Sequence, residues 1–186
     1  MEGKYMNKYY ELNVCGVKRN LPIIKINEEL AIASFVILGD TELISNVALD
    51  IAKKLPKVDV LVTAEAKGIP LVYEISKILN MKSFIVARKS IKPYMKNAIC
   101  SEVLSITTQK KQLLCLDGVD VDKIKGKKVA IIDDVISTGE SLTALQKLVE
   151  DAGGIVTSKA AILAEGEASK REDIIFLEKL PLFPLK

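Results

Sequence analysis

Histidine is absent from the 186 residues of the chain. Without it there are no imidazole general bases, no Ser-His or Cys-His nucleophile pairs, and no transition-metal sites built on histidine. Any catalysis must therefore use carboxylates, lysine, arginine, hydroxyl groups and the backbone.

Cysteine is scarce, and its three positions are Cys15, Cys100 and Cys115. An odd number, a wide spacing and the lack of a C-x-x-C pair favour neither a disulfide framework nor a zinc site. We expect three reduced and mostly buried thiols.

Long apolar runs and strong charge are also missing. The longest run, Leu30 to Leu38, includes Ser34 and is far shorter than the about 20 residues that a membrane-spanning helix needs, so it indicates a buried strand. The first residues, MEGKYMNKYY, lack the apolar core of a signal peptide. A net charge of +3 is too small for a dedicated nucleic-acid surface. We expect a cytoplasmic protein without a membrane or nucleic-acid partner.

The composition is that of a folded protein, with 49% apolar and 27% charged residues. The length suits one domain over residues 1–186. Short β-branched runs predict buried parallel strands, and apolar stripes at helical spacing lie between them. The strands are expected at residues 58–63, 84–87, 129–132 and 155–163, and the helical stripes at residues 43–55 and 142–149.

This alternation predicts a doubly wound, mostly parallel α/β sheet with right-handed crossovers. Ligands bind such sheets outside the carboxyl ends of the strands. Residues 39–186 would form this core, and residues 1–38, which alternate less clearly, a small hood. The segments ICSEVLSI and KQLLCL indicate a β-hairpin with a flexible loop near residues 103–112.

The segment Val129 to Ser141 reads VAIIDDVISTGES. It predicts a strand that delivers two carboxylates beside a hydroxyl- and glycine-rich turn at the start of a helix. Free amides and the helix dipole make such a turn an anion site, and Gly139 permits close approach of a phosphate. The carboxylates would repel a phosphate unless they serve hydroxyls or a cation, so a sugar phosphate with a metal satisfies both.

This segment resembles the signature of type I phosphoribosyltransferases, which bind 5-phosphoribosyl-1-pyrophosphate (PRPP). The resemblance implies that Asp133 and Asp134 contact the ribose hydroxyls and help to hold Mg²⁺, in part through water, while PRPP carries most of the metal's ligands. It also implies that one turn binds the 5′-phosphate, through Ser137, Thr138, Gly139, Glu140 and Ser141. An alternative is the aspartate pair of Mg²⁺-binding phosphatases and response regulators, which lack the Ser-Thr-Gly-x-Ser run.

Two further segments are similar to parts of this family. Glu65, Ala66, Lys67 and Gly68 follow a predicted strand and resemble the pyrophosphate loop, in which a cis peptide is expected between Glu65 and Ala66. Arg88, Lys89 and Lys92 resemble the basic R-K-x-x-K segment of adenine and orotate enzymes. The resemblance implies catalytic roles for Lys67 and Arg88 in drawing off pyrophosphate, and a homodimer in which Lys92 reaches the neighbouring site.

The base is less clearly indicated. The segment Ser105 to Lys110 is closer to xanthine enzymes and purine repressors, whereas the C-terminal segment lacks the lysine that meets an oxo group and has Gly166 or Glu167 near its place. We expect a Mg²⁺-dependent purine phosphoribosyltransferase of purine salvage, with adenine favoured. The alternatives are xanthine, hypoxanthine or orotate as the base, and a non-catalytic sensor of PRPP.

Overall fold

A parallel five-stranded sheet forms the centre of the structure, a computed structural model that describes residues 8–104 and 111–185. Its strand order is β10-β9-β8-β4-β5, and every neighbouring pair is parallel. The strands are β4 (Val60–Ala64), β5 (Ile85–Ala87), β8 (Lys128–Ile136), β9 (Ile155–Glu165) and β10 (Glu178–Leu180). The predicted doubly wound α/β sheet is confirmed.

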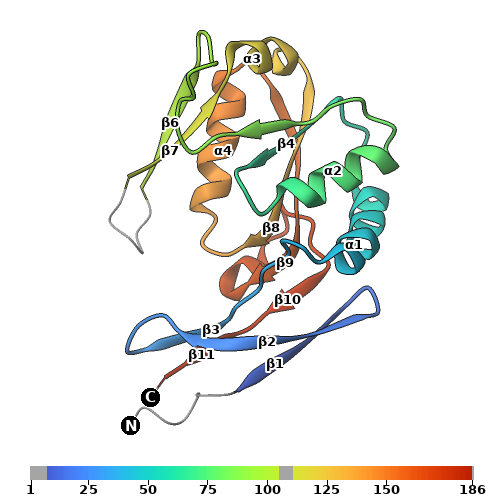
Figure 1. Cartoon of the computed structure of the whole chain (residues 1–186), viewed down its shortest axis with the longest axis vertical. Coiled ribbons are helices and arrows are strands. Elements are labelled where there is room, and N and C mark those ends of the chain that lie inside the picture. The colour runs from blue at the N-terminus through green and yellow to red at the C-terminus, as the bar shows by residue number, and fades with distance from the viewer. Residues whose placement is uncertain (1–7, 105–110, 186) are drawn as a thin grey trace.

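Helices cover both faces of this sheet (Figure 1). Helices α1 (Thr41–Lys54) and α2 (Ile69–Ile78) pack on one face, and α3 (Gly118–Ile124) and α4 (Glu140–Asp151) on the other. Side chains of β8 alternate between the two cores, with Ala130 and Ile132 toward α1 and α2, and Val129 and Ile131 toward α4. Burial on both faces explains why these strands read as continuous apolar runs. Helix α3 was not predicted from the sequence.

A second, antiparallel sheet forms the hood. Its order is β1-β2-β3-β11, with β1 (Tyr9–Val14), β2 (Val17–Lys25), β3 (Leu30–Ala33) and β11 (Leu182–Pro184). The expected strand at Leu30 to Leu38 is wrong beyond Ala33, where the strand ends. The hood also takes its edge strand from the C-terminus, and Pro184 is tolerated there because an edge strand has an unpaired side. Figure 1 shows the hood beyond the end toward which β8 and β9 run.

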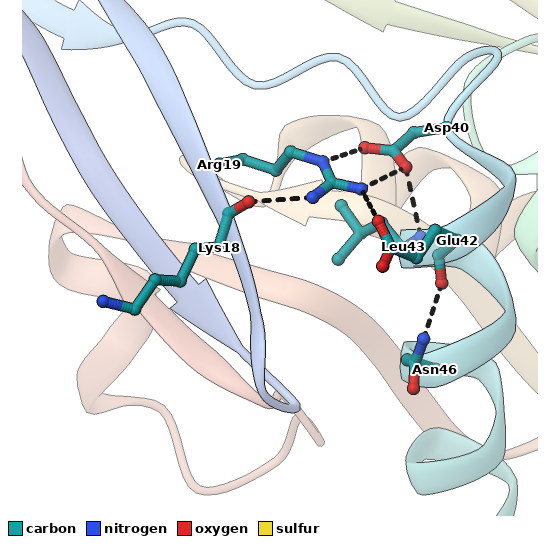
Figure 2. A network of polar contacts seen from close by, with 6 residues as sticks. All are labelled: Lys18, Arg19, Asp40, Glu42, Leu43 and Asn46. Atoms are coloured by element: carbon teal, nitrogen blue, oxygen red, sulfur yellow. Dashed lines mark hydrogen bonds and ion pairs between the residues drawn. The ribbon is translucent and has the colours of Figure 1, made fainter.

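An ion-pair network joins the hood to the core (Figure 2). Arg19 of β2 binds both carboxylate oxygens of Asp40, through Nε at 2.7 Å and Nη2 at 2.8 Å, and its Nη2 also lies 2.7 Å from Glu42. Asp40 caps α1 by accepting a hydrogen bond from the amide of Leu43. The Arg19 guanidinium holds the pKa of Asp40 below its ordinary value. The hood is therefore fixed to the start of α1.

The expected β-hairpin is present as β6 (Ile99–Leu104) and β7 (Lys111–Leu116). The flexible loop was expected near residues 103–112, and residues 105–110 lie outside the described residues. The expectation of three reduced thiols is wrong, because Cys100 and Cys115 form a disulfide. Antiparallel register places these two residues directly opposite each other, with their Cα atoms 4.1 Å apart, a proximity that spacing in the sequence does not reveal.

Cys15 remains a free thiol. Burial and a hydrogen bond with Asp50 raise its pKa to about 11, so it stays protonated and unreactive at neutral pH. No helix in residues 8–104 or 111–185 is long and apolar enough to cross a membrane.

Candidate active site

A cavity of about 550 Å³ opens at the carboxyl ends of β4 and β8. Most of its lining comes from the loop after β4 and from the segment that runs from the end of β8 into α4. Lys89, which follows β5, and Leu114 of β7 complete it. Its lining residues are Ala64–Lys67, Lys89, Leu114 and Asp133–Leu142. The cavity therefore lies at the sheet edge where the sequence predicted a ligand.

The two aspartates have different environments. Asp134 is buried, with its Oδ2 atom 2.7 Å from Nζ of Lys67. Asp133 is partly exposed and its Oδ1 accepts a hydrogen bond of 2.8 Å from the amide of Asp134. Burial of the Asp133 carboxyl, together with the neighbouring charge of Asp134, raises its pKa to about 7. The two carboxylates are therefore not equivalent.

The side chains after the aspartate pair do not continue the alternation of β8, although its pairing with β9 keeps one register from Ala130 to Ile136. Strict alternation from Ile132 would direct Val135 away from the core beside α1 and α2, yet Val135 packs against that core and Ile136 against the other. Both carboxylates line one cavity although they are adjacent on a strand.

The turn after β8 has the geometry of an anion site. Gly139 has φ +84°, in the left-handed region that favours glycine, and directly precedes the first residue of α4. The amides of the first helical turn have no partners within the helix. Ser137, Thr138, Gly139, Glu140 and Ser141 all line the cavity. The binding of a phosphate by these residues stays a prediction.

The loop after β4 contributes the opposite wall. The peptide between Glu65 and Ala66 is cis, as expected. Glu65, Ala66 and Lys67 line the cavity, whereas Gly68 lies behind them at the start of α2. A Cβ on Gly68 would lie 2.1 Å from Oγ1 of the buried Thr63. Gly68 therefore allows close packing of the loop on the sheet, and ligand contact is not needed to explain it.

Arg88 reaches the site through another side chain. Its Nε and Nη2 atoms lie 3.1 and 3.2 Å from the two Glu65 oxygens, and its Nη1 donates to the Tyr94 hydroxyl at 2.6 Å. Glu65 also accepts a hydrogen bond from the amide of Lys89. The Arg88 guanidinium holds the pKa of Glu65 below its ordinary value. Arg88 is adjacent to the cavity wall but is not part of it.

Lys89 and Lys92 differ in their position relative to the cavity. Lys89 lines the cavity, while Nζ of Lys92 donates to the Ser90 hydroxyl at 2.6 Å and lies outside the lining. The structure thus brings together the aspartate pair, the anion turn, Glu65 to Lys67 and Lys89. Gly68, Arg88 and Lys92 do not line the cavity.

Glu165 was missed as a site residue. It is the last residue of β9, and its carboxylate accepts a hydrogen bond from Ser137 and lies near the charge of Lys67. Burial nevertheless raises the pKa of Glu165 above its ordinary value. The available signal was its position, since strand ends at this edge were predicted to face the ligand.

The donor set suits a magnesium ion that arrives with its own ligands. No group of three or more potential metal-ligating side chains occurs in the described parts of the chain. Mg²⁺ commonly uses one or two protein carboxylates together with substrate phosphates and water. Asp133 and Asp134 fit that mode of binding and do not form an all-protein metal cage.

The structure is therefore a doubly wound α/β protein with a glycine-containing turn and two aspartates at the carboxyl edge of its sheet. Residues 40–179 match the family model described as "Phosphoribosyl transferase domain". The chain therefore belongs to the phosphoribosyltransferase family, as the sequence motifs indicated.

The curated relatives are named for hypoxanthine and guanine, whereas the solved structures are named for adenine. The hypoxanthine/guanine phosphoribosyltransferase of Methanocaldococcus sp. (strain FS406-22) is 36% identical over 141 residues, which are 75% of this chain and 68% of that protein. The adenine phosphoribosyltransferase of Thermoanaerobacter pseudethanolicus superposes with a TM-score of 0.66 at 24% identity, covering 92% of this chain and 95% of that one. The Trypanosoma brucei adenine enzyme gives 0.67 at 18% identity, covering 95% and 78%. At these identities the structures establish the fold alone.

Proposed function

We propose that the protein is a purine phosphoribosyltransferase that transfers ribose 5-phosphate from PRPP to a purine base and releases pyrophosphate. The observation that carries this proposal is the shared cavity of Asp133, Asp134 and the turn 137–141. Carboxylates beside an anion turn suit a ligand that offers hydroxyls and a phosphate at once. A simple phosphate ligand would leave the two carboxylates without a purpose.

PRPP would span the cavity from one wall to the other. The amides and hydroxyls of Ser137 to Ser141 would hold the 5′-phosphate, and Asp133 and Asp134 would accept hydrogen bonds from the ribose hydroxyls. The loop Glu65 to Lys67 and the Lys89 side chain, on the opposite wall, would face the pyrophosphate. This orientation places the ribose C1 between the two walls.

The reaction breaks the bond from C1 to pyrophosphate and forms a bond from C1 to a nitrogen of the base. Lys67, Lys89 and, after release from Glu65, Arg88 would stabilise the charge that develops on the leaving oxygen. Mg²⁺, when bound, would neutralise part of the pyrophosphate charge. Positioning and charge stabilisation are sufficient for this chemistry, so the absence of histidine is no obstacle.

We favour a 6-oxopurine as the base, which means hypoxanthine or guanine. Relatives that are 36% and 33% identical over 141 residues bear that name, whereas the two adenine structures described above are 24% and 18% identical. Adenine remains a second candidate, because Gly166 and Glu167 stand near the place of the lysine that meets an oxo group. A homodimer, with Lys92 acting in the neighbouring site, and a single domain over residues 1–186 also remain proposals.

The test is release of pyrophosphate from PRPP and Mg²⁺ with a panel of hypoxanthine, guanine, adenine, xanthine, orotate and uracil. We expect release with a purine and formation of the matching nucleoside monophosphate. Release with adenine alone would replace the 6-oxopurine proposal. If PRPP binds and none of the six bases supports turnover, the sensor alternative is correct.

A further inference from the structure

The side chain of Arg171 lies against the anion turn. Its Nη1 atom is 2.6 Å from the position that a Cβ at Gly139 would occupy. Gly139 is therefore constrained twice, by its positive φ and by the guanidinium that fills the space beside it. Arg171 comes from the segment after the 3₁₀ helix Gly166–Lys170, far from the turn in sequence.

An acidic partner fixes the orientation of this guanidinium. Asp173 accepts hydrogen bonds from Nε at 2.9 Å and from Nη2 at 2.8 Å. Lys159, whose side chain is only 15% exposed, also binds Asp173 and holds that carboxylate in place. The bidentate pair leaves Nη1 as the nitrogen directed at the turn. The guanidinium is thus held on the side of the turn by a chain of three charged residues.

The charge of Arg171 is placed where the turn needs it. Asp133 and Glu165 lie close to the turn and would oppose a bound phosphate once ionised. Lys67 and Lys89 are cations on the cavity side, and Lys67 is paired with Asp134. A cation beside Gly139 offsets these carboxylates without occupying the cavity, because Arg171 is not one of its lining residues.

We propose that Arg171 is a positioning residue for the 5′-phosphate, which it serves through Gly139. It restrains the turn and adds positive charge beside the amides that receive the phosphate. It does not touch the ligand, so it is not a catalytic residue. This inference rests on the proposed function, because it assumes that the turn binds the 5′-phosphate of PRPP.

The experiment compares Arg171→Gln with Lys170→Gln, which removes the same charge one residue earlier. Lys170 is exposed and pairs with Glu167, away from the turn. Dissociation constants are measured for two probes, ribose 5-phosphate and pyrophosphate, by calorimetry. We expect Arg171→Gln to weaken ribose 5-phosphate about tenfold, the size of a lost charge-assisted interaction, and pyrophosphate less than about twofold. Lys170→Gln should change neither.

Two further readouts separate positioning from a general loss of structure. In steady-state assays Arg171→Gln should raise the KM for PRPP about tenfold with kcat within about twofold, and Arg171→Lys should restore part of the loss because it keeps the charge. Asp173→Asn, which releases the guanidinium and leaves its charge, should weaken ribose 5-phosphate by a smaller factor. If Arg171→Gln weakens both probes equally, or neither, Arg171 does not position the 5′-phosphate.

The same measurements separate this inference from the proposed function. Failure of the unaltered protein to bind ribose 5-phosphate and PRPP would overturn both. Normal binding by the unaltered protein, retained in Arg171→Gln and Asp173→Asn, would overturn only the role of Arg171.

Discussion

The two walls of the cavity present different chemical groups. The wall after β8 is mostly backbone, with the left-handed Gly139 and the first amides of α4. The opposite wall is mostly charged side chains that already have partners, since Arg88 binds Glu65 and, across the cavity, Lys67 binds Asp134. On the first wall a phosphate would meet backbone amides and hydroxyl groups. On the second wall a ligand must displace an existing ion pair.

This difference suggests a division of tasks. A backbone site costs little to reorganise and suits the 5′-phosphate, which stays bound throughout the reaction. Exchangeable ion pairs suit pyrophosphate, whose charge rises during the reaction and which must leave afterwards.

The largest effect should follow from loss of the carboxylates between the two walls. Replacement of Asp133 and Asp134 by asparagine keeps their shape but removes the charge, so we expect turnover to fall by about 10²-fold to 10³-fold. The unfolding transition should be preserved, because Lys67 remains half-exposed to solvent when Asp134 is neutral. Pyrophosphate release and a thermal melt measure the two effects. Unchanged turnover would mean that the ribose is bound elsewhere.

The backbone wall is tested by Gly139→Ala. A Cβ there meets Nη1 of Arg171 and is strained by φ +84°, so we expect the KM for PRPP to rise about tenfold and the free energy of unfolding to fall by about 1–2 kcal/mol. The matched control is Gly126→Ala, which has φ +70° but nothing within 4 Å of the added atom. The control should lose stability and keep its KM. Equal KM values in the two variants would argue against a phosphate at the turn.

The side-chain wall is tested by Arg88→Gln and Glu65→Gln. Loss of the Arg88 charge should weaken pyrophosphate about fivefold to tenfold, whereas Glu65→Gln frees Arg88 and should strengthen pyrophosphate a fewfold. Ribose 5-phosphate affinity should stay within about twofold in both variants. Competition binding with each probe measures these changes. Shifts of the same sign in the two variants would show that the Arg88–Glu65 pair is a fixed structural unit.

The smallest effect should come from a similar ion pair outside the cavity. Arg19→Gln removes the partner of Asp40, so we expect a melting temperature lower by a few degrees at neutral pH and unchanged affinity for both probes. Because the pKa of Asp40 is lowered in the folded protein, this stabilisation is present above the unfolded pKa of about 3.9 and is lost as pH falls through the folded value. The difference in melting temperature should therefore shrink below about pH 4. A constant difference down to pH 2 would assign the effect to packing.

The backbone wall could be predicted from sequence because it is local. Residues 129–141 contain the strand, the carboxylates, the glycine and the helix start in one segment. The cis peptide between Glu65 and Ala66, which the resemblance to the family implied, also lies within one short segment. In these cases the residues that determine the geometry are neighbours in the chain.

The rest depends on contacts between distant segments. The pairing of Lys67 with Asp134 requires the adjacency of β4 and β8, and β11 joins the hood only because the C-terminus returns to β3. The disulfide between Cys100 and Cys115 follows from hairpin register. The number and spacing of the cysteines in the sequence do not indicate it. Arg171 lies beside Gly139 only in the folded chain.

The most direct test of a two-walled PRPP site is simultaneous binding of its two halves. Ribose 5-phosphate is titrated into the protein with Mg²⁺ in the absence and then in the presence of saturating pyrophosphate. We expect both ligands to bind at once, each more weakly than PRPP, and PRPP to displace both. Mutual exclusion of ribose 5-phosphate and pyrophosphate would contradict the account, because it would show that the cavity offers a single anion site.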